Sequence, residues 1–132
     1  MSAALPEFEI SAAHAMARVQ ATQAFADSGP QASRIALYDA GAQLLVALTL
    51  TKPCGSILDD GTLLLTQSNI GTDLIVASGQ AVSAVWSTSD GKLVGRGLVT
   101  DEAGDGHFKL LGSTGTQLYA GGKVILGETR IS

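Results

Sequence analysis

Two patterns of hydrophobic and polar positions divide the chain near residue 30. Up to that point the spacing is helical, with an apolar stripe formed by Met16, Val19 and Phe25 among many alanines. Ser11 is a good N-cap, and a Gly-Pro pair follows the last apolar position. The pattern predicts one alanine-rich helix over residues 11–27, which would pack closely on a sheet or on a neighbouring subunit.

From residue 34 onward the apolar positions alternate, and Gly, Asp and Ser interrupt the alternation. Eight short strands are predicted, at residues 34–38, 44–51, 62–66, 72–77, 81–89, 92–99, 107–111 and 123–131. No helical segment falls between them, which argues against a parallel α/β sheet. The predicted fold class is therefore all-β: a jelly-roll-like sandwich or barrel of about eight antiparallel strands with one N-terminal α-helix.

The pair Asp90-Gly91 predicts a hairpin with a two-residue type I′ turn. In that register Trp86 faces Gly95, whose missing side chain would leave room for the indole ring. The face that carries Trp86 is the drier one. The core predicted on this face consists of Trp86, Val82, Val99 and Leu93.

The opposite face of the same hairpin is mixed, and it carries Val85, Val94 and Leu98. Three aliphatic side chains on one face are not expected to be fully exposed to water. We therefore expect this face to be partly covered, either by the helix or by another chain.

The size of the chain, 132 residues and 13.4 kDa, is that of one domain. We expect a short N-terminal arm at residues 1–10 and a single β domain at residues 11–132. Phe8 and Ile10 are the side chains by which the arm would anchor on a neighbouring subunit. The alternative for the arm is terminal disorder.

Charge is sparse: eight Lys and Arg stand against twelve Asp and Glu, for a net charge of −4. The basic residues are scattered, which argues against direct contact with nucleic acid or an anionic membrane. The chain also shows neither a signal-peptide pattern nor an apolar stretch long enough to span a bilayer, so we expect synthesis in a cytoplasm.

No catalytic, metal or phosphate-binding motif is present, so we expect no enzyme, no metal and no cofactor. Cys54, the single cysteine, is interpreted as a small buried hydrophobe, the alternative being a reactive thiol. Asp101, Glu102 and Asp105 lie in one loop and leave two interpretations open, a solvated turn or a calcium site. Tyr119 is the one aromatic side chain suited to an exposed sugar-binding platform.

The low charge and the aliphatic residues on both strand faces indicate a protein that meets other protein surfaces, because interface centres are depleted in charge. The order of the segments also resembles a group of small proteins encoded among the virion genes of tailed bacteriophages and prophages. The likeness covers residues 12–132, and the segments that carry it are RIALYDAG, LLVALTLTKPCGSI, DGTLLLT, AVSAVWSTSDGKLVGRGLVT and GGKVILGETRIS. The chain departs from that pattern at residues 101–106, where a shorter Gly-rich link is expected.

The resemblance implies a virion structural protein with no chemical site to carry over. We expect a capsid decoration or cement protein that stabilises the head shell, with the major capsid protein or other virion proteins as partners and with formation of a homo-oligomer. Its expected location is the virion. The alternatives are a head–tail joining or tail structural protein, and a host-surface glycan-binding module.

Overall fold

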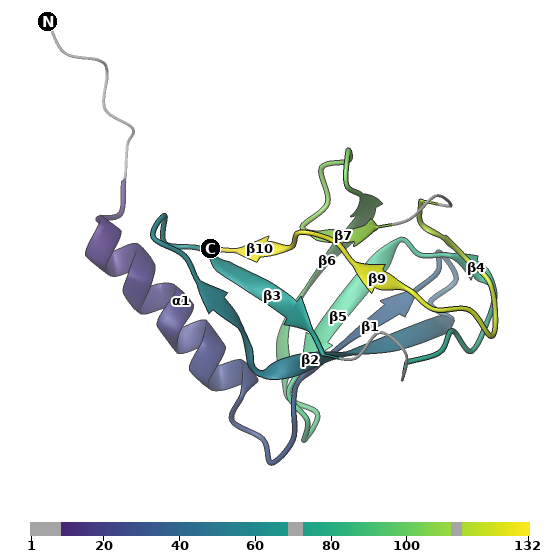
Figure 1. Ribbon diagram of the computed structural model, residues 1–132, viewed down its shortest axis with the longest axis horizontal. Helices are drawn as coiled ribbons and strands as arrows, with labels where there is room; N and C mark the ends of the chain where they lie inside the picture. The colour runs from purple at the N-terminus through teal and green to yellow at the C-terminus, as the bar shows by residue number, and fades with distance from the viewer. Residues whose placement is uncertain (1–8, 69–72, 112–114) are drawn as a thin grey trace, which may run out of the picture.

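The computed structural model describes residues 9–68, 73–111 and 115–132, and within them one helix precedes ten strands (Figure 1). The helix is α1 (Ala12–Ala26), begun by Ser11, whose hydroxyl accepts a hydrogen bond from the N–H of His14. The strands are β1 (Arg34–Tyr38), β2 (Leu44–Ile57), β3 (Leu63–Gln67), β4 (Gly79–Gln80), β5 (Ser83–Ser87), β6 (Leu93–Asp101), β7 (Phe108–Leu111), β8 (Gln117–Leu118), β9 (Ile125–Leu126) and β10 (Arg130–Ile131).

Eight of these strands form one curled sheet in the order β10-β3-β2-β1-β5-β6-β7-β9, and the sheet makes a half-barrel. β4 and β8 form a small second sheet. The prediction of an all-β fold with one N-terminal helix is thus confirmed. The prediction that all strands are antiparallel is wrong at one place, because β6 and β7 run parallel.

The predicted strands agree with the structure best where alternation was uninterrupted. β1 has the predicted bounds, whereas β2 continues past the break expected at Lys52-Pro53, with an irregular register and a cis peptide at that pair. Of the predicted strand 72–77, residue 72 lies outside the described residues, and Leu74 forms only an isolated bridge with Lys123. The predicted last strand is divided between β9 and β10.

The hairpin of β5 and β6 has the predicted register as far as Trp86, opposite Gly95, and then shifts by one residue. The N–H of Gly91 donates to the carbonyl of Thr88, and Gly91 has a φ of 92° while Asp90 does not have a positive φ. A type I′ turn needs a positive φ at both central residues, so this is a longer turn with a glycine bulge. The shift moves Leu93 to the outer face, where it is 52% exposed, and its predicted place in the core is wrong.

Trp86 and Val99 are buried, as predicted, while Val82 is only half-buried at the start of the hairpin. The expectation that Trp86 lies over Gly95 is wrong, because a Cβ placed on Gly95 would meet nothing within 4 Å. The indole is held instead by its N–H, which donates to the buried hydroxyl of Ser33 at 3.1 Å. The glycine that faces an aromatic ring is Gly97, where an added Cβ would lie 3.3 Å from the Phe108 ring.

The parallel pair of β6 and β7 depends on a tight acidic loop, residues 102–107. A Cβ on Gly104 would lie 2.5 Å from the Thr100 side chain, and a Cβ on Gly106 would lie 2.7 Å from the Leu98 carbonyl. The N–H of Gly106 donates to the Thr100 hydroxyl, and the Lys109 ammonium donates to the Gly104 carbonyl. Glycine at these two positions lets the chain fold back on β6 and continue beside it.

The two end strands of the sheet, β9 and β10, are separated by only three residues of the chain, so residues 125–131 border both edges of the half-barrel. On one side the N–H of Gly127 donates to Lys109 of β7, and on the other the N–H of Leu65 in β3 donates to the Thr129 carbonyl. Gln67 of β3 reaches across with its side chain: its amide N–H donates to Val124 and its amide oxygen accepts from Leu126, at 3.0 and 2.8 Å. The side-chain amide of Gln67 thus joins β3 to the β9 segment, although no backbone ladder connects these two strands.

We expect Gln67→Ala to lower the free energy of unfolding by about 1–3 kcal/mol, because two backbone groups lose their partners in a part-buried place. Urea unfolding followed by the fluorescence of Trp86 measures the change. Thr66→Ala, an exposed neighbour on the same strand, is the matched control and should change stability by less than about 0.5 kcal/mol. Equal stability of Gln67→Ala and its control would show that the amide link does not stabilise the fold.

Candidate protein-contact surfaces

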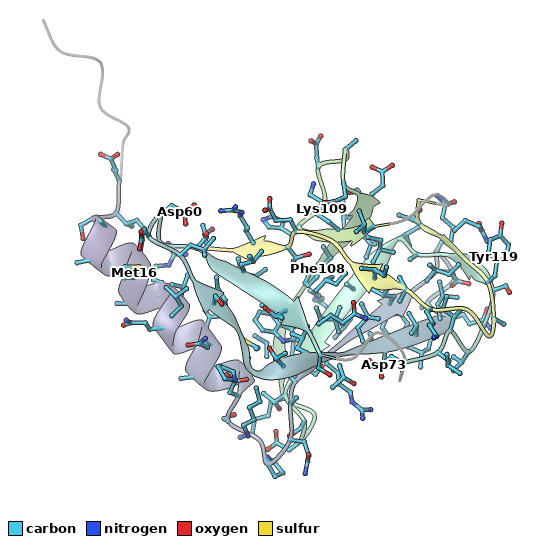
Figure 2. The ribbon with its side chains drawn as sticks, viewed as in Figure 1. Met16, Asp60, Asp73, Phe108, Lys109 and Tyr119 are labelled. Carbon is cyan, nitrogen blue, oxygen red and sulfur yellow. The ribbon has the colours of Figure 1, made fainter. Side chains whose placement is uncertain are left out.

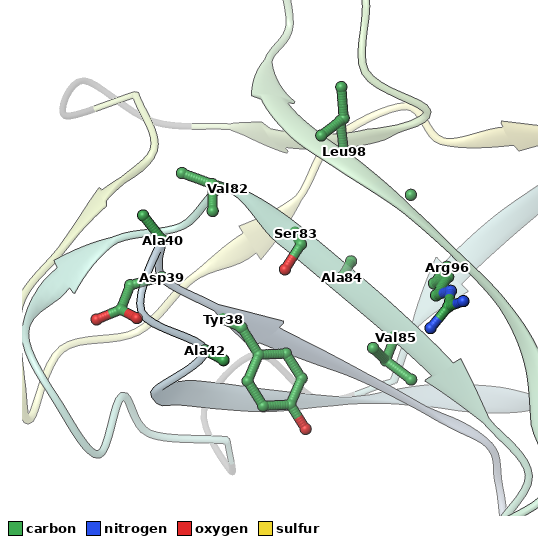
Figure 3. Close-up of a pocket in the computed structure, with 11 residues that line it drawn as sticks. Tyr38, Asp39, Ala40, Ala42, Val82, Ser83, Ala84, Val85, Arg96 and Leu98 are labelled. Carbon is green, nitrogen blue, oxygen red and sulfur yellow. The ribbon is translucent and has the colours of Figure 1, made fainter.

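The outer surface of the sheet contains a groove of about 550 Å³, here called the outer groove (Figure 3). It lies over β1, β5 and β6 on the side away from the core. Its walls are mostly apolar, and Leu98 projects from β6 with 68% of its surface exposed. The lining consists of Tyr38, Asp39, Ala40 and Ala42 with residues 82–85 and 96–98.

The strand register explains why these side chains meet. Tyr38, Ser83 and Leu98 are cross-strand neighbours in one row, and Val85 and Arg96 are neighbours in the next. The sequence predicts that the helix or another chain partly covers Val85, Val94 and Leu98. Val94 is half-buried and packs against the core. α1 packs chiefly on β2 and contributes no residue to the outer groove, so the helix does not cover it.

The outer groove has one charged side chain at each end, Asp39 at one and Arg96 at the other (Figure 3). Among the residues that the structure describes, neither forms an ion pair. Asp39 uses one carboxylate oxygen to accept from the N–H groups of Gly41 and Gln43. The alternation of β1 and of the hairpin gives the face of each of these residues, but no pattern in the sequence indicates a role for either charge.

The rim of the groove beside Asp39 contains a strained residue. Ala42 has a φ of 64°, in the left-handed region that costs an L-amino acid about 1–2 kcal/mol. Its N–H donates to the Asp39 carbonyl, and the N–H of Asp39 donates to Gln43, so the loop is a three-residue hairpin connection. Such loops favour glycine at this position, and here a methyl group lines the groove instead.

The second exposed surface is the outer side of α1. Only Val19 and Ala26 of the helix are buried. Ala15 lies against Gly61, and the Gln23 side chain donates to the Gly55 carbonyl at 2.8 Å, which fixes the helix on β2 and the turn that follows it.

Nine of the fifteen helix residues are exposed, and Arg18 is the only one of the nine with a full charge. Phe25, expected in the apolar stripe, is 44% exposed. A helix facing water usually carries charged residues on its outer side. The outer surface of α1 is therefore unusually poor in charge.

The chain enters this helix through Glu9 and Ile10. Ile10, one of the two predicted anchors, is half-buried, and Glu9 is exposed. Phe8, the other anchor, and the rest of the predicted arm lie outside the described residues.

Cys54 is fully buried under the end of the helix, where its N–H donates to the Asp27 carboxylate. Burial, together with the nearby Asp27 charge, raises the pKa of the Cys54 thiol from 9.0 to about 12. A protonated, enclosed thiol is a weak nucleophile. The interpretation of Cys54 as a small buried hydrophobe is therefore confirmed.

Acidic side chains hold turns together, both at Asp60 and in the loop that carries Asp101, Glu102 and Asp105. Asp60 accepts from the N–H and hydroxyl of Thr62 and from Arg130, and the Thr62 hydroxyl is the main reason why the pKa of Asp60 is lowered. Asp101 accepts from Ala103 in its own loop, and Glu102 accepts from Glu128 at 3.4 Å. Within residues 9–68, 73–111 and 115–132, no three His, Cys, Asp or Glu side chains are grouped so that they could hold a metal.

Tyr119 lies at the end of the molecule opposite the helix residue Met16, and it is 58% exposed (Figure 2). The expectation of an exposed ring is confirmed. The hollow beside it measures about 90 Å³, well below the roughly 300 Å³ of a typical small-molecule pocket. The two histidines, His14 and His107, are exposed.

Comparison with family models, with curated proteins and with solved structures found no match to this chain. In the part of the chain that the structure describes, no helix has the length and apolar character needed to cross a membrane. The two surfaces poor in charge are thus the features from which function can be argued.

We expect Ala42→Gly to raise the free energy of unfolding by about 0.5–1 kcal/mol, because glycine adopts the left-handed conformation without the steric cost of alanine. Thermal and urea unfolding measure the difference. Ala40→Gly is the matched control in the same loop: it lacks a positive φ and should be slightly destabilised. A loss of stability in Ala42→Gly would contradict the strain.

We expect the Cys54 thiol to be unreactive in the folded protein, with alkylation at pH 8 at least about 100-fold slower than in urea. Above pH 9 the unfolded chain loses the thiol proton while the folded protein keeps it, so stability must fall as the pH rises from 9 toward 12. The fall approaches about 1.4 kcal/mol per pH unit. Cys54→Ala should lack this part of the pH dependence, and identical pH profiles of the two proteins would refute the assignment.

Proposed function

We propose that this protein is a virion structural protein that acts by binding other protein subunits, as a decoration or cement protein of a capsid shell. The observation that carries the proposal is the outer surface of α1, with nine exposed residues and a single full charge. The resemblance of its segment order to virion proteins of tailed phages supports the choice of partner. In this role the partners are the major capsid protein or other virion proteins.

An exposed alanine surface suits contact with another protein. Alanine has no side-chain rotamer freedom to lose on binding, and its small size allows the backbones of two subunits to approach closely. Apolar area removed from water contributes about 25 cal/mol per Å². Even a small contact of this kind stabilises a shell strongly when it is repeated over many copies.

The N-terminal arm completes the proposed contact. The arm precedes α1 directly in the sequence, and the first exposed alanines of the helix follow it. Phe8 would anchor the arm on the shell. The helix and the arm would then form one continuous surface for the shell subunit. Chemistry plays no part in this role, and we propose that the protein is not an enzyme.

The test uses particles assembled from the same virion genes with this gene deleted. We expect intact heads that lose their DNA at lower temperature, and we expect added purified protein to bind the shell and restore stability. Removal of residues 1–10 should weaken binding at least about tenfold while the far-ultraviolet circular dichroism stays unchanged, because the described residues of the arm, Glu9 and Ile10, precede the helix and neither is fully buried. Heads that form normally but carry no tails would instead assign the protein to the head–tail joint.

A charge placed on the helix surface separates this contact from others. Ala17→Glu keeps a good helix former but puts a carboxylate at the proposed contact, and we expect shell binding at least about tenfold weaker. Ala120→Glu makes the same change beside Tyr119, at the far end of the molecule, and should bind normally. If both variants bind as tightly as the unchanged protein, α1 is not the contact surface.

A further inference from the structure

We propose that the outer groove is the surface at which two copies of this protein pair, about a two-fold axis that lies in the plane of the interface. This inference goes beyond the proposed role in a shell and does not depend on it. It rests on the apolar lining of the groove, on the absence of cover by residues 9–68, 73–111 and 115–132, and on the placement of its two charges.

The groove presents apolar side chains that the described residues of the chain leave uncovered. Leu98 is 68% exposed, and Tyr38 and Val85 are only half-buried in a hollow of about 550 Å³. Exposed apolar surface of this kind on a small domain is typical of an interface. When two sheets pack face to face, their backbones lie about 10 Å apart and such rows of side chains come into contact.

The charges identify a second copy as the occupant. Asp39 and Arg96 lie at opposite ends of the groove, with Tyr38 toward the Asp39 end and Val85 toward the Arg96 end (Figure 3). A two-fold axis in the interface plane, perpendicular to the line between the charges, exchanges these two ends. Arg96 of each copy then faces Asp39 of the other, and Tyr38 faces the other copy's Val85.

Such pairing is the rule of a two-fold interface, in which residue i contacts j while j contacts i. One carboxylate oxygen of Asp39 is engaged in its own loop, and the second has no hydrogen-bond partner among the described residues. Arg96 likewise has no ion pair there. An apolar centre with charges at its rim is also the usual anatomy of a protein interface.

A cross-complementation experiment tests this geometry. Sedimentation equilibrium of the purified full chain, across the micromolar range, should show a monomer–dimer equilibrium. Arg96→Asp opposes two carboxylates at each end of the interface, and Asp39→Arg opposes two cations. Each variant alone should therefore dimerise at least about 100-fold more weakly.

An equimolar mixture of the two variants should restore the dimer, because in the mixed pair both ends again join opposite charges. Lys92→Asp is the matched control: it reverses a charge at the tip of the same hairpin, outside the groove lining, and should leave the dimer unchanged. Where Asp39→Arg fails to fold because its loop loses an acceptor, Ala40→Arg places the charge one residue along the rim. Circular dichroism identifies that case.

A monomer throughout the micromolar range overturns the proposal. So does a dimer that tolerates Arg96→Asp, since its interface lies elsewhere, and so does a mixture that stays monomeric. These results concern the purified protein alone. Shell binding can therefore fail while the dimer forms, and the dimer can fail to form while the shell is bound. The two proposals are thus tested separately.

Discussion

The half-barrel depends on one short segment, residues 125–131, which meets both edges of the sheet. A curled sheet that stops short of closure leaves two rows of unpaired backbone groups, and each row invites pairing with another chain. Here β9 and β10 occupy the two edges from consecutive stretches of chain, and Gln67 supplies an amide where no ladder forms. The core side chains, Trp86 among them, stay dry because this segment holds the edges together.

That closure decides which surfaces remain for binding. With its edges occupied, the described part of the protein offers partners mainly the faces of the sheet and the helix. The inner face is the core, and α1 lies chiefly on β2. The outer side of β1, β5 and β6 and the outer side of α1 are left, and both are poor in charge.

The sequence predicts local structure well where a single residue type decides the backbone. Alternation locates β1, and Ser11 locates the start of α1. Asp90-Gly91 marks a turn but fits two turn types, and the choice between them decides whether Leu93 faces the core. The link from Gln67 to Leu126 spans 59 positions, and the return of β7 beside β6 depends on how two glycines contact Thr100 and Leu98. The periodicity of apolar positions predicts neither the Gln67 link nor the return of β7.

The candidate site shows the same division. The sequence indicates that Val85 and Leu98 need cover, but only the position of α1 shows that the helix does not provide it. It also contains Asp39 and Arg96 without indicating that they lie at opposite ends of one groove. When apolar contact supplies most of the association energy, a few charges decide the orientation of the partner, because a wrong orientation opposes like charges. On two surfaces with so little charge, the orientation of the partner must therefore be specified mainly by shape. In the outer groove it is specified also by the single pair of Asp39 and Arg96.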